Sequence, residues 1–567
     1  MGLNGALQIG RSAMLTSQAA ITVAGNNMAN AATPGYHRQI ANLIPSRSEL
    51  IGRNQFVGTG VSLVSVNRAI DYALQARLRD AISDENAAAV DDRFLSAVEG
   101  IQNELSDDDL SSRLSAFFNS FSELANNPLD NAVRTVVIQQ GVSVADHLNM
   151  IREEYVGLRE EVDRSLGATV ERVDGLLGEI ATINQQIASA EGGQGGAGGG
   201  ANSLRDHRDQ LIDELSGYID ITTADQPNGV VDIMVGSTPL VLAGESRGLE
   251  LRRENGPDGI EVSIRVGDDG TLLDIDSGSI GALMRQRSET IDPAIAAIDE
   301  FAGQLAFQVN RVHSQGQGSS HRSEFTGSVR ITDPSANLNG SYSGLPWPVE
   351  NGSFQIHVVD PESGNHTTHQ IMVDPENDSL EDVVARINAE AMSEFTASVT
   401  TDGELRLVAA TGREIAFGED TSGFLAALGI NGFFTGTDAT NLSVDQALID
   451  DPTLLSASSD FTPGGNSIAL LMADLEDTPV DAFNGQSLRE KWQSSVNELA
   501  VRTSAARTTF QSSQLVRANL DAQSQSVSGV SIDEEAIDLM TLQRQFQAAA
   551  RFITVIDEAM ETLLSIA

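Results

Sequence analysis

The sequence predicts a mainly α-helical protein with inserted β-rich modules, in which terminal coiled-coil helices flank an elongated multi-domain stem. Apolar residues recur in a seven-residue repeat near both ends of the chain, and this repeat is typical of a helix that packs against a partner along a narrow seam. Helical periodicity also dominates from about residue 67 to 190. Short runs of alternating polarity, separated by glycine-containing turns, predict β-structure within 218–275 and 345–440.

The first helix is predicted from a seam whose members step alternately by four and three residues. They are Leu3, Leu7, Gly10, Met14, Ser17, Ile21, Ala24 and Met28. The small residues in this seam would allow two helix axes to approach closely. Asparagines and the turn Thr33-Pro34-Gly35 end the helix, because proline cannot continue it and glycine favours a tight turn.

Long helices are predicted to form the stem. An acidic start at Ser106–Asp109 precedes Phe117, Phe118 and Phe121 and resembles a capping box. A longer helical pattern runs from Val144 to Ile187 and slips near Leu166, which indicates a stutter in the repeat. The glycine run over 191–200 lacks the lysine and hydroxyl residue of a phosphate-binding loop, so it predicts a flexible connector.

Two β-rich parts interrupt the helices. Turns at Pro227-Asn228-Gly229 and Asp258-Gly259 predict a small antiparallel unit, and Ser379 is expected to cap a helix within a later α+β module. A helix from about Ser288 to His313 separates the two. The predicted domains are a terminal coiled coil (1–45 and 525–567), a helical stem (46–217, 276–330 and 441–524), a β unit (218–275) and an outer module (331–440).

The last helix has the most regular seam. Its members are Leu539, Leu542, Phe546, Ala549, Ile553, Ile556, Met560 and Leu563. Either terminal helix taken alone could be an ordinary core helix, but regular seams at both ends favour pairing of the termini, with each other or with other copies. Three acidic residues from Asp533 to Glu535 lie in the first turn, where the helix dipole favours negative charge.

A comparison of energies predicts how the ends behave in an isolated chain. Each large seam side chain contributes roughly 2 kcal/mol when buried, whereas ordering costs roughly 1–2 kcal/mol per residue in backbone entropy. We therefore expect each end to be largely disordered in the monomer and to become helical on assembly.

Composition excludes several classes of function. The chain has 567 residues, a net charge of −45 and no cysteine. Nucleic acid and anionic membranes are therefore poor partners, and disulfides, thiolate catalysis and cysteine–zinc sites are excluded. No apolar run is long enough to span a bilayer, and the start lacks the basic and apolar blocks of a cleaved signal peptide.

No motif predicts a catalytic, cofactor-binding or metal site. His366 and His369 fall in a predicted strand, where their spacing does not place both rings on one face. Asp374, Glu376 and Asp378 lack the central glycine and terminal glutamate of a calcium loop. We interpret these residues as parts of a packed or solvated surface.

Two terminal stretches resemble a known family. The residues Asn26, Asn27, Asn30, Thr33, Pro34, Gly35, Tyr36 and Arg38 resemble the N-terminal signature of the bacterial flagellar axial proteins, which comprise rod, hook and hook-associated proteins. Residues 528–551 resemble the start of the family's C-terminal helix. Residues 117–134, 183–187 and 205–211 resemble the helical domain of the hook-associated proteins.

The resemblance implies a structural, non-enzymatic protein at the junction between the hook and the filament, outside the cell. It also implies a homo-oligomeric ring, contacts with the hook protein and with a second junction protein, an export chaperone, and export through the flagellar type III channel. A hook or rod protein, a secreted adhesin that uses 345–440, and an enzyme with an unrecognised site remain as alternatives.

Overall fold

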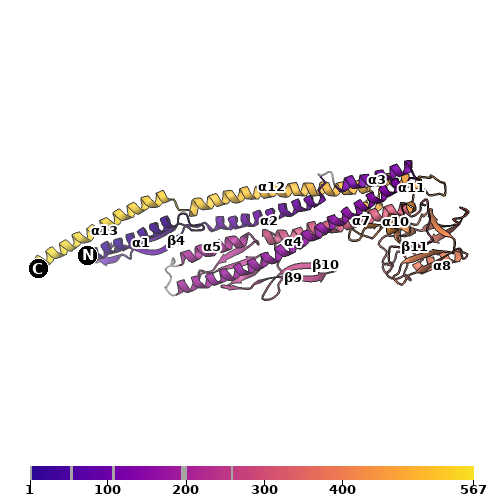
Figure 1. The fold of residues 1–567 in the computed structure, drawn as a ribbon. Helices are drawn as coiled ribbons and strands as arrows, with labels where there is room; N and C mark the ends of the chain where they lie inside the picture. Colours follow the sequence, from indigo (N-terminus) through magenta and orange to yellow (C-terminus); the bar gives the residue numbers. More distant parts are fainter. Residues whose placement is uncertain (1–2, 52–54, 105–108, 193–200, 257–258, 567) are drawn as a thin grey trace. The chain divides into compact units, whose positions relative to one another are not determined.

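The computed structural model describes residues 3–51, 55–104, 109–192, 201–256 and 259–566 (Figure 1). The chain divides into two compact units. The first, which we call the terminal unit, contains Met1–Arg93, Val162–Gln286 and Ala505–Ala567. The second, the middle unit, contains Phe94–Glu161 and Arg287–Ser504. Helices dominate both units, which confirms the predicted fold class of a mainly α protein with β-rich insertions.

Three long helices contribute residues to both units: α2 (Tyr72–Gln102), α4 (Asn131–Gly192) and α12 (Leu488–Ser528). The helix predicted from Val144 therefore starts 13 residues earlier, at Asn131. Its buried positions Leu158, Val162, Leu166, Val170 and Val173 include successive steps of four residues, which confirms the predicted stutter. The glycine run over 193–200 and the residues Ser106–Asp108 lie outside the described residues.

The terminal unit holds both chain ends. Helix α1 (Leu3–Ala29) packs along α13 (Ile532–Ile566) and also contacts β4 (Figure 1). Its remaining elements are β1 (Gln39–Pro45), β2 (Glu49–Ile51), β3 (Gln55–Val57), β4 (Val61–Arg68), α5 (Asn202–Ser216), β5 (Thr222–Asp225), β6 (Val231–Val235), β7 (Thr238–Leu242), β8 (Glu245–Ser246), β9 (Leu249–Gly256), β10 (Gly259–Val266) and α6 (Gly278–Arg285).

The strands of this unit pair in antiparallel fashion. Strands β5 to β8 form one sheet in sequence order, and β9 pairs with β10. The turn before β6 has Gly229 at φ +81°, a conformation that favours glycine. The hairpin β1–β4 was not predicted, because most of its side chains on both faces are exposed or half-buried and leave no alternating pattern.

The middle unit packs helices and a β module around apolar cores. Its helices are α3 (Leu110–Asn126), α7 (Asp292–His313), α8 (Leu380–Glu390), α9 (Phe424–Ala427), α10 (Gln446–Asp450) and α11 (Ser467–Asp474), and its short turns are η2 (Pro452–Leu454), η3 (Leu475–Asp477) and η4 (Asp481–Phe483). A π-helical turn, η1, spans Gln286–Ile291. Phe117 of α3 lies 5.3 Å from Phe433 between ring centroids, so the predicted phenylalanine face is core.

The β module of this unit contains two three-stranded antiparallel sheets, ordered β13-β12-β16 and β11-β15-β14. Their strands are β11 (Glu324–Thr326), β12 (Gly352–Val359), β13 (His366–Val373), β14 (Phe395–Val399), β15 (Leu405–Ala409) and β16 (Glu414–Gly418), and β17 (Phe434–Thr435) pairs with β18 (Ser443–Val444). Ser379 caps α8 as predicted, in a full capping box with Asp382. This box satisfies backbone donors at the start of the helix.

A buried histidine, His313, is predicted to make the stability of the middle unit depend on pH. Nδ1 of His313 donates to the carbonyl of Asn431 at 2.8 Å, and Nε2 accepts from the amide of Ser456 at 3.0 Å. Burial lowers the pKa of His313 to about 4, and nearby Arg134 adds to the effect. The folded form therefore holds the neutral ring, and stability falls as pH drops from about 6.5 toward 4, because the unfolded chain then binds the proton.

We expect His313 to remove roughly 3 kcal/mol of stability over this pH range. The variant His313→Gln can keep both hydrogen bonds but has no group that titrates there. Chemical unfolding of both proteins at several pH values should show that their difference in stability depends on pH. If the difference in stability between the two proteins were the same at every pH, His313 would not be the group that titrates.

Candidate assembly surface and adjoining polar network

The predicted terminal seam faces α1 in the terminal unit. Most of the residues between the seam positions of α13 are exposed. Seven seam positions are half-buried or buried: Leu539, Leu542, Phe546, Ala549, Ile553, Ile556 and Met560. Leu563 is 55 % exposed. On α1, the seam members Leu3, Leu7, Met14, Ile21 and Met28 are half-buried, and Gly10, Ser17 and Ala24 are buried. The two seams therefore face each other within one chain.

Gly10 sets how closely the two helices approach. A Cβ atom at this position would lie 2.7 Å from Cγ1 of Ile553, a separation that forces the neighbour to move. We expect Gly10→Ala to destabilise the α1–α13 pair by about 1–2 kcal/mol through overpacking. Gly25, which has open space around its Cα, is the matched control on the same helix. Faster amide exchange in α13 for Gly10→Ala than for Gly25→Ala would support this contact, and equal rates would contradict it.

A second apolar stripe on α13 remains uncovered. Ile537, Met540 and Val555 are all more than half exposed on one face, with Val555 at 60 %, and the exposed Arg544 and Arg551 lie between Met540 and Val555. These residues do not belong to the seven-residue repeat, so the periodicity of the sequence does not predict them. Several large apolar side chains exposed along one helix are typical of an interaction surface.

Asn27, in the asparagine-rich motif, connects the strand after the turn to the last helix. Its Nδ2 donates to the carbonyl of Gln39 at 2.9 Å and to Oε2 of Glu535 at 3.1 Å, and its Oδ1 accepts from the amide of Gln39 at 2.9 Å. Nε of Arg38 donates to the other oxygen of Glu535 at 2.7 Å. Glu535 is buried at the start of α13, so these bonds fix the end of the helix pair.

Tyr36 completes the same group. Burial raises its pKa to about 12, with contributions from Asp206 and Glu535. The hydroxyl therefore stays protonated and donates to Oδ1 of Asn27 at 2.8 Å. The other asparagines shape the turn: Nδ2 of Asn30 donates to the carbonyl of Asn26 at 3.0 Å.

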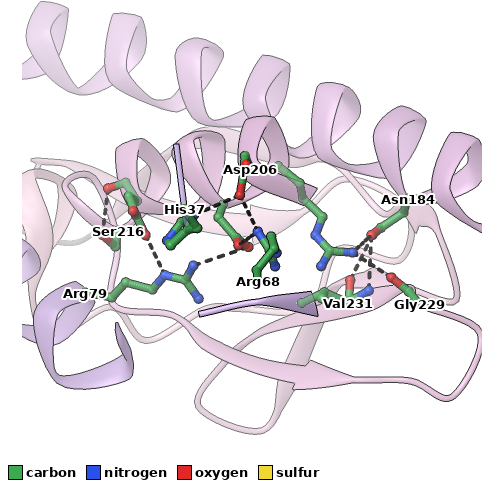
Figure 2. A network of polar contacts seen from close by, with 11 residues as sticks. His37, Arg68, Arg79, Asn184, Asp206, Ser216, Gly229 and Val231 are labelled. Atoms are coloured by element: carbon green, nitrogen blue, oxygen red, sulfur yellow. Dashed lines mark hydrogen bonds and ion pairs between the residues drawn. The ribbon is translucent and has the colours of Figure 1, made fainter. Parts of the chain in front are cut away.

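Three aspartates on one face of α5 bind arginines from the first 80 residues (Figure 2). Nη1 of Arg68 lies 2.8 Å from Asp206 and 2.7 Å from Asp209, and Nε of Arg79 lies 2.7 Å from Asp213. Burial lowers the pKa of Arg68, but the two carboxylates more than offset it and the pKa is raised. Burial raises the pKa of Asp213, against the opposing charge of Arg79.

The turn of the motif is attached to this network. Nδ1 of His37 lies 2.8 Å from Oδ1 of Asp206, and Gln210 donates to the carbonyl of Pro34. Gly35 has φ +70°, and a Cβ there would collide with Gln210. The turn Thr33-Pro34-Gly35 therefore docks on α5 as well as ending α1.

Arg208 extends the network toward α4. Its Nη1 donates to Oδ1 of Asn184 at 3.1 Å and to the carbonyl of Gly229 at 2.7 Å (Figure 2). Asn184 in turn donates to the carbonyl of Val231 at 2.9 Å and accepts from its amide at 3.1 Å. Residues 183–187 and 205–211 stand out in the sequence only by their resemblance to a known helical domain, since their spacing gives no sign that these polar residues are buried.

The histidines and acidic turns have structural partners. His366 stacks on Phe461 with ring centroids 3.9 Å apart, and His369 lies 3.0 Å from Glu394. Asp378 pairs with Arg386 at 2.7 Å. In the ranges that the structure describes, no histidine and acidic side chains are grouped so that they could hold a metal ion. Among the same residues, no helix has the length and apolar character needed to cross a membrane.

Comparison with known proteins gives consistent matches. Residues 95–325 match the family model of the flagellar hook-associated protein FlgK helical domain. Residues 7–37 match the flagella basal body rod protein model, and residues 522–566 match the flagellar basal body rod FlgEFG protein C-terminal model.

Curated relatives align over nearly the whole chain. Flagellar hook-associated protein 1 of Bacillus subtilis is 26 % identical, and the alignment covers 99 % of this chain and 97 % of that protein. The protein of the same name from Escherichia coli is 25 % identical, with 98 % of each chain covered. The flagellar hook junction protein FlgK from Burkholderia pseudomallei has a similar fold, with a TM-score of 0.50 and 15 % identity over 80 % of this chain and 100 % of that one.

Proposed function

Since this chain is similar over nearly its whole length to flagellar hook-associated proteins, we infer that it belongs to that branch of the flagellar axial proteins, is a structural component of the bacterial flagellum and joins the hook to the filament. The observation that carries this inference is the alignment of 98–99 % of the chain with hook-associated relatives. The helical-domain match over 95–325 favours this role over that of a hook or rod protein. The protein would then act outside the cell, as part of the flagellum.

We propose that the chain works as a homo-oligomeric ring. In this proposal, the α1–α13 pair forms a rigid unit, and the exposed apolar stripe of α13 contacts neighbouring copies. The support is the uncovered stripe that contains Ile537 and Val555, because association would remove this apolar surface from water. The family resemblance further suggests the hook protein, a second junction protein and an export chaperone as partners.

The role at the junction can be tested by location. Gold-labelled antibody against this chain should mark the boundary between hook and filament in isolated flagella. A cell that lacks the chain should keep its hooks and lose attached filaments. Labelling along the whole hook or in the rod would contradict the junction role.

The ring contact predicts the behaviour of Val555→Asp. Because Val555 points away from the seam, we expect the variant to keep the stability of the native chain within about 0.5 kcal/mol but to lose incorporation into flagella. Leu129→Asp is the matched control, since Leu129 is 64 % exposed in a turn outside the terminal helices. Normal filament attachment with Val555→Asp would contradict the proposed contact.

A further inference from the structure

The negative charge of this chain is distributed very unevenly. Residues 1–93 and 505–567 contain 12 basic and 15 acidic residues, a net charge of −3. Residues 94–504, which we call the acidic segment, contain 23 basic and 65 acidic residues, a net charge of −42. Nearly all the net charge therefore lies outside the two stretches that contain the terminal helices.

Basic side chains of the acidic segment are already engaged within the chain. Arg152 pairs with Asp299 at 2.7 Å, and Arg406 pairs with Glu324 at 2.7 Å. Similar pairs join Arg386 to Asp378 and Arg413 to Asp360, at 2.7 and 2.9 Å. Cations paired in this way offer little compensation for the acidic residues of a second copy.

The terminal stretches taken together carry far less net charge. Helix α1 contains one charged side chain, Arg11. Helix α13 contains seven acidic and two basic residues, but Gln543, Gln545 and Gln547 on its middle turns are exposed and uncharged, and so are apolar side chains such as Val555. Attraction between copies at these helices is therefore apolar, and it opposes the charge repulsion between acidic segments.

We propose that copies of this chain associate through their terminal helices only when dissolved cations screen the acidic segments, so that self-association is promoted by salt. The inference rests on the proposed homo-oligomer. Dissolved salt shortens the range of repulsion, from about 30 Å at about 0.01 M to about 10 Å at about 0.1 M. Apolar contacts persist over that range, so the balance shifts toward association.

Sedimentation of the full-length protein tests this balance directly. The protein concentration at half-association should fall about tenfold between roughly 0.02 M and 0.3 M NaCl, a range in which screening changes strongly. MgCl₂ should act at lower concentrations than NaCl, because a divalent ion screens more effectively. Association that is independent of salt or weakened by it would overturn the inference while leaving the ring possible. No association at any salt concentration would contradict the ring itself, and this inference with it.

Two variants that each add three negative charges test whether association occurs through α13. The variant Gln543→Glu/Gln545→Glu/Gln547→Glu adds three negative charges to exposed positions of α13, and Thr396→Glu/Ser398→Glu/Thr401→Glu adds the same number to exposed positions of the acidic segment. The α13 set doubles the net charge of the terminal stretches, so it should require several-fold more salt for half-association. The second set changes a large charge slightly and should shift the midpoint less than about twofold. Equal shifts for the two sets would overturn the inference.

Discussion

Replacement of Ile553 by aspartate is expected to give a soluble protein that cannot join the flagellum. Ile553 is half-buried in the α1–α13 seam and lies against Gly10. The variant loses roughly 2 kcal/mol of apolar burial and adds the cost of placing a carboxylate beside apolar groups. Both terms act directly on the contact between the two helices, so we expect α13 to separate from α1 along the seam. Loss of swimming, with normal levels of the protein in the cell, is the expected result.

Two comparisons make this result specific. Thr396→Asp places the same charge at an exposed position outside the terminal helices and should assemble normally. Amide exchange in α13 should be faster for Ile553→Asp than for Val555→Asp, because only the first change disturbs the contact with α1, although both variants fail to assemble. Motile cells with filaments attached through Ile553→Asp would show that the seam does not hold the terminal helices for assembly.

The terminal seam could be predicted because it depends on a local repeat. Leu539 and Ile553 are 14 residues apart, two full repeats, and both face α1 in the structure. The prediction that each end is disordered in the monomer remains a prediction, since it concerns the free energy of the pair and not its geometry. Amide exchange in the free protein, with strong protection at Ile553 contradicting disorder, still tests it.

The polar network could not be predicted because it depends on contacts distant in sequence. Arg68 and Asp209 are separated by 141 positions, and Asn27 and Glu535 by 508. Charged residues are mostly solvated, so nothing local marked these as buried. The asparagine-rich motif could be recognised by resemblance, but only the structure explains Asn27, whose amide joins the strand after the turn to the last helix.

Loss of Arg68 is expected to be among the most destabilising single changes in the terminal unit. Its guanidinium is nearly fully buried between Asp206 and Asp209. Arg68→Met keeps much of the side-chain volume but leaves two buried carboxylates without this partner. Breaking a buried ion pair on one side costs about 3–5 kcal/mol. Since His37 also bonds to Asp206, the turn that carries the motif should loosen, and assembly should weaken with stability.

Compensating changes separate lost pairing from lost packing. In Arg68→Met/Asp206→Asn/Asp209→Asn no carboxylate is left uncompensated at these positions, so most of the lost stability should return. Arg252→Met is the control for arginine replacement, because Arg252 pairs with Glu250 at an exposed site where such pairs contribute less than about 1 kcal/mol. Chemical unfolding measures all three variants. If the triple variant were no more stable than Arg68→Met, buried charge would not be the cause, and the docking of the motif turn on α5 would depend on packing around Gly35 and Gln210 instead.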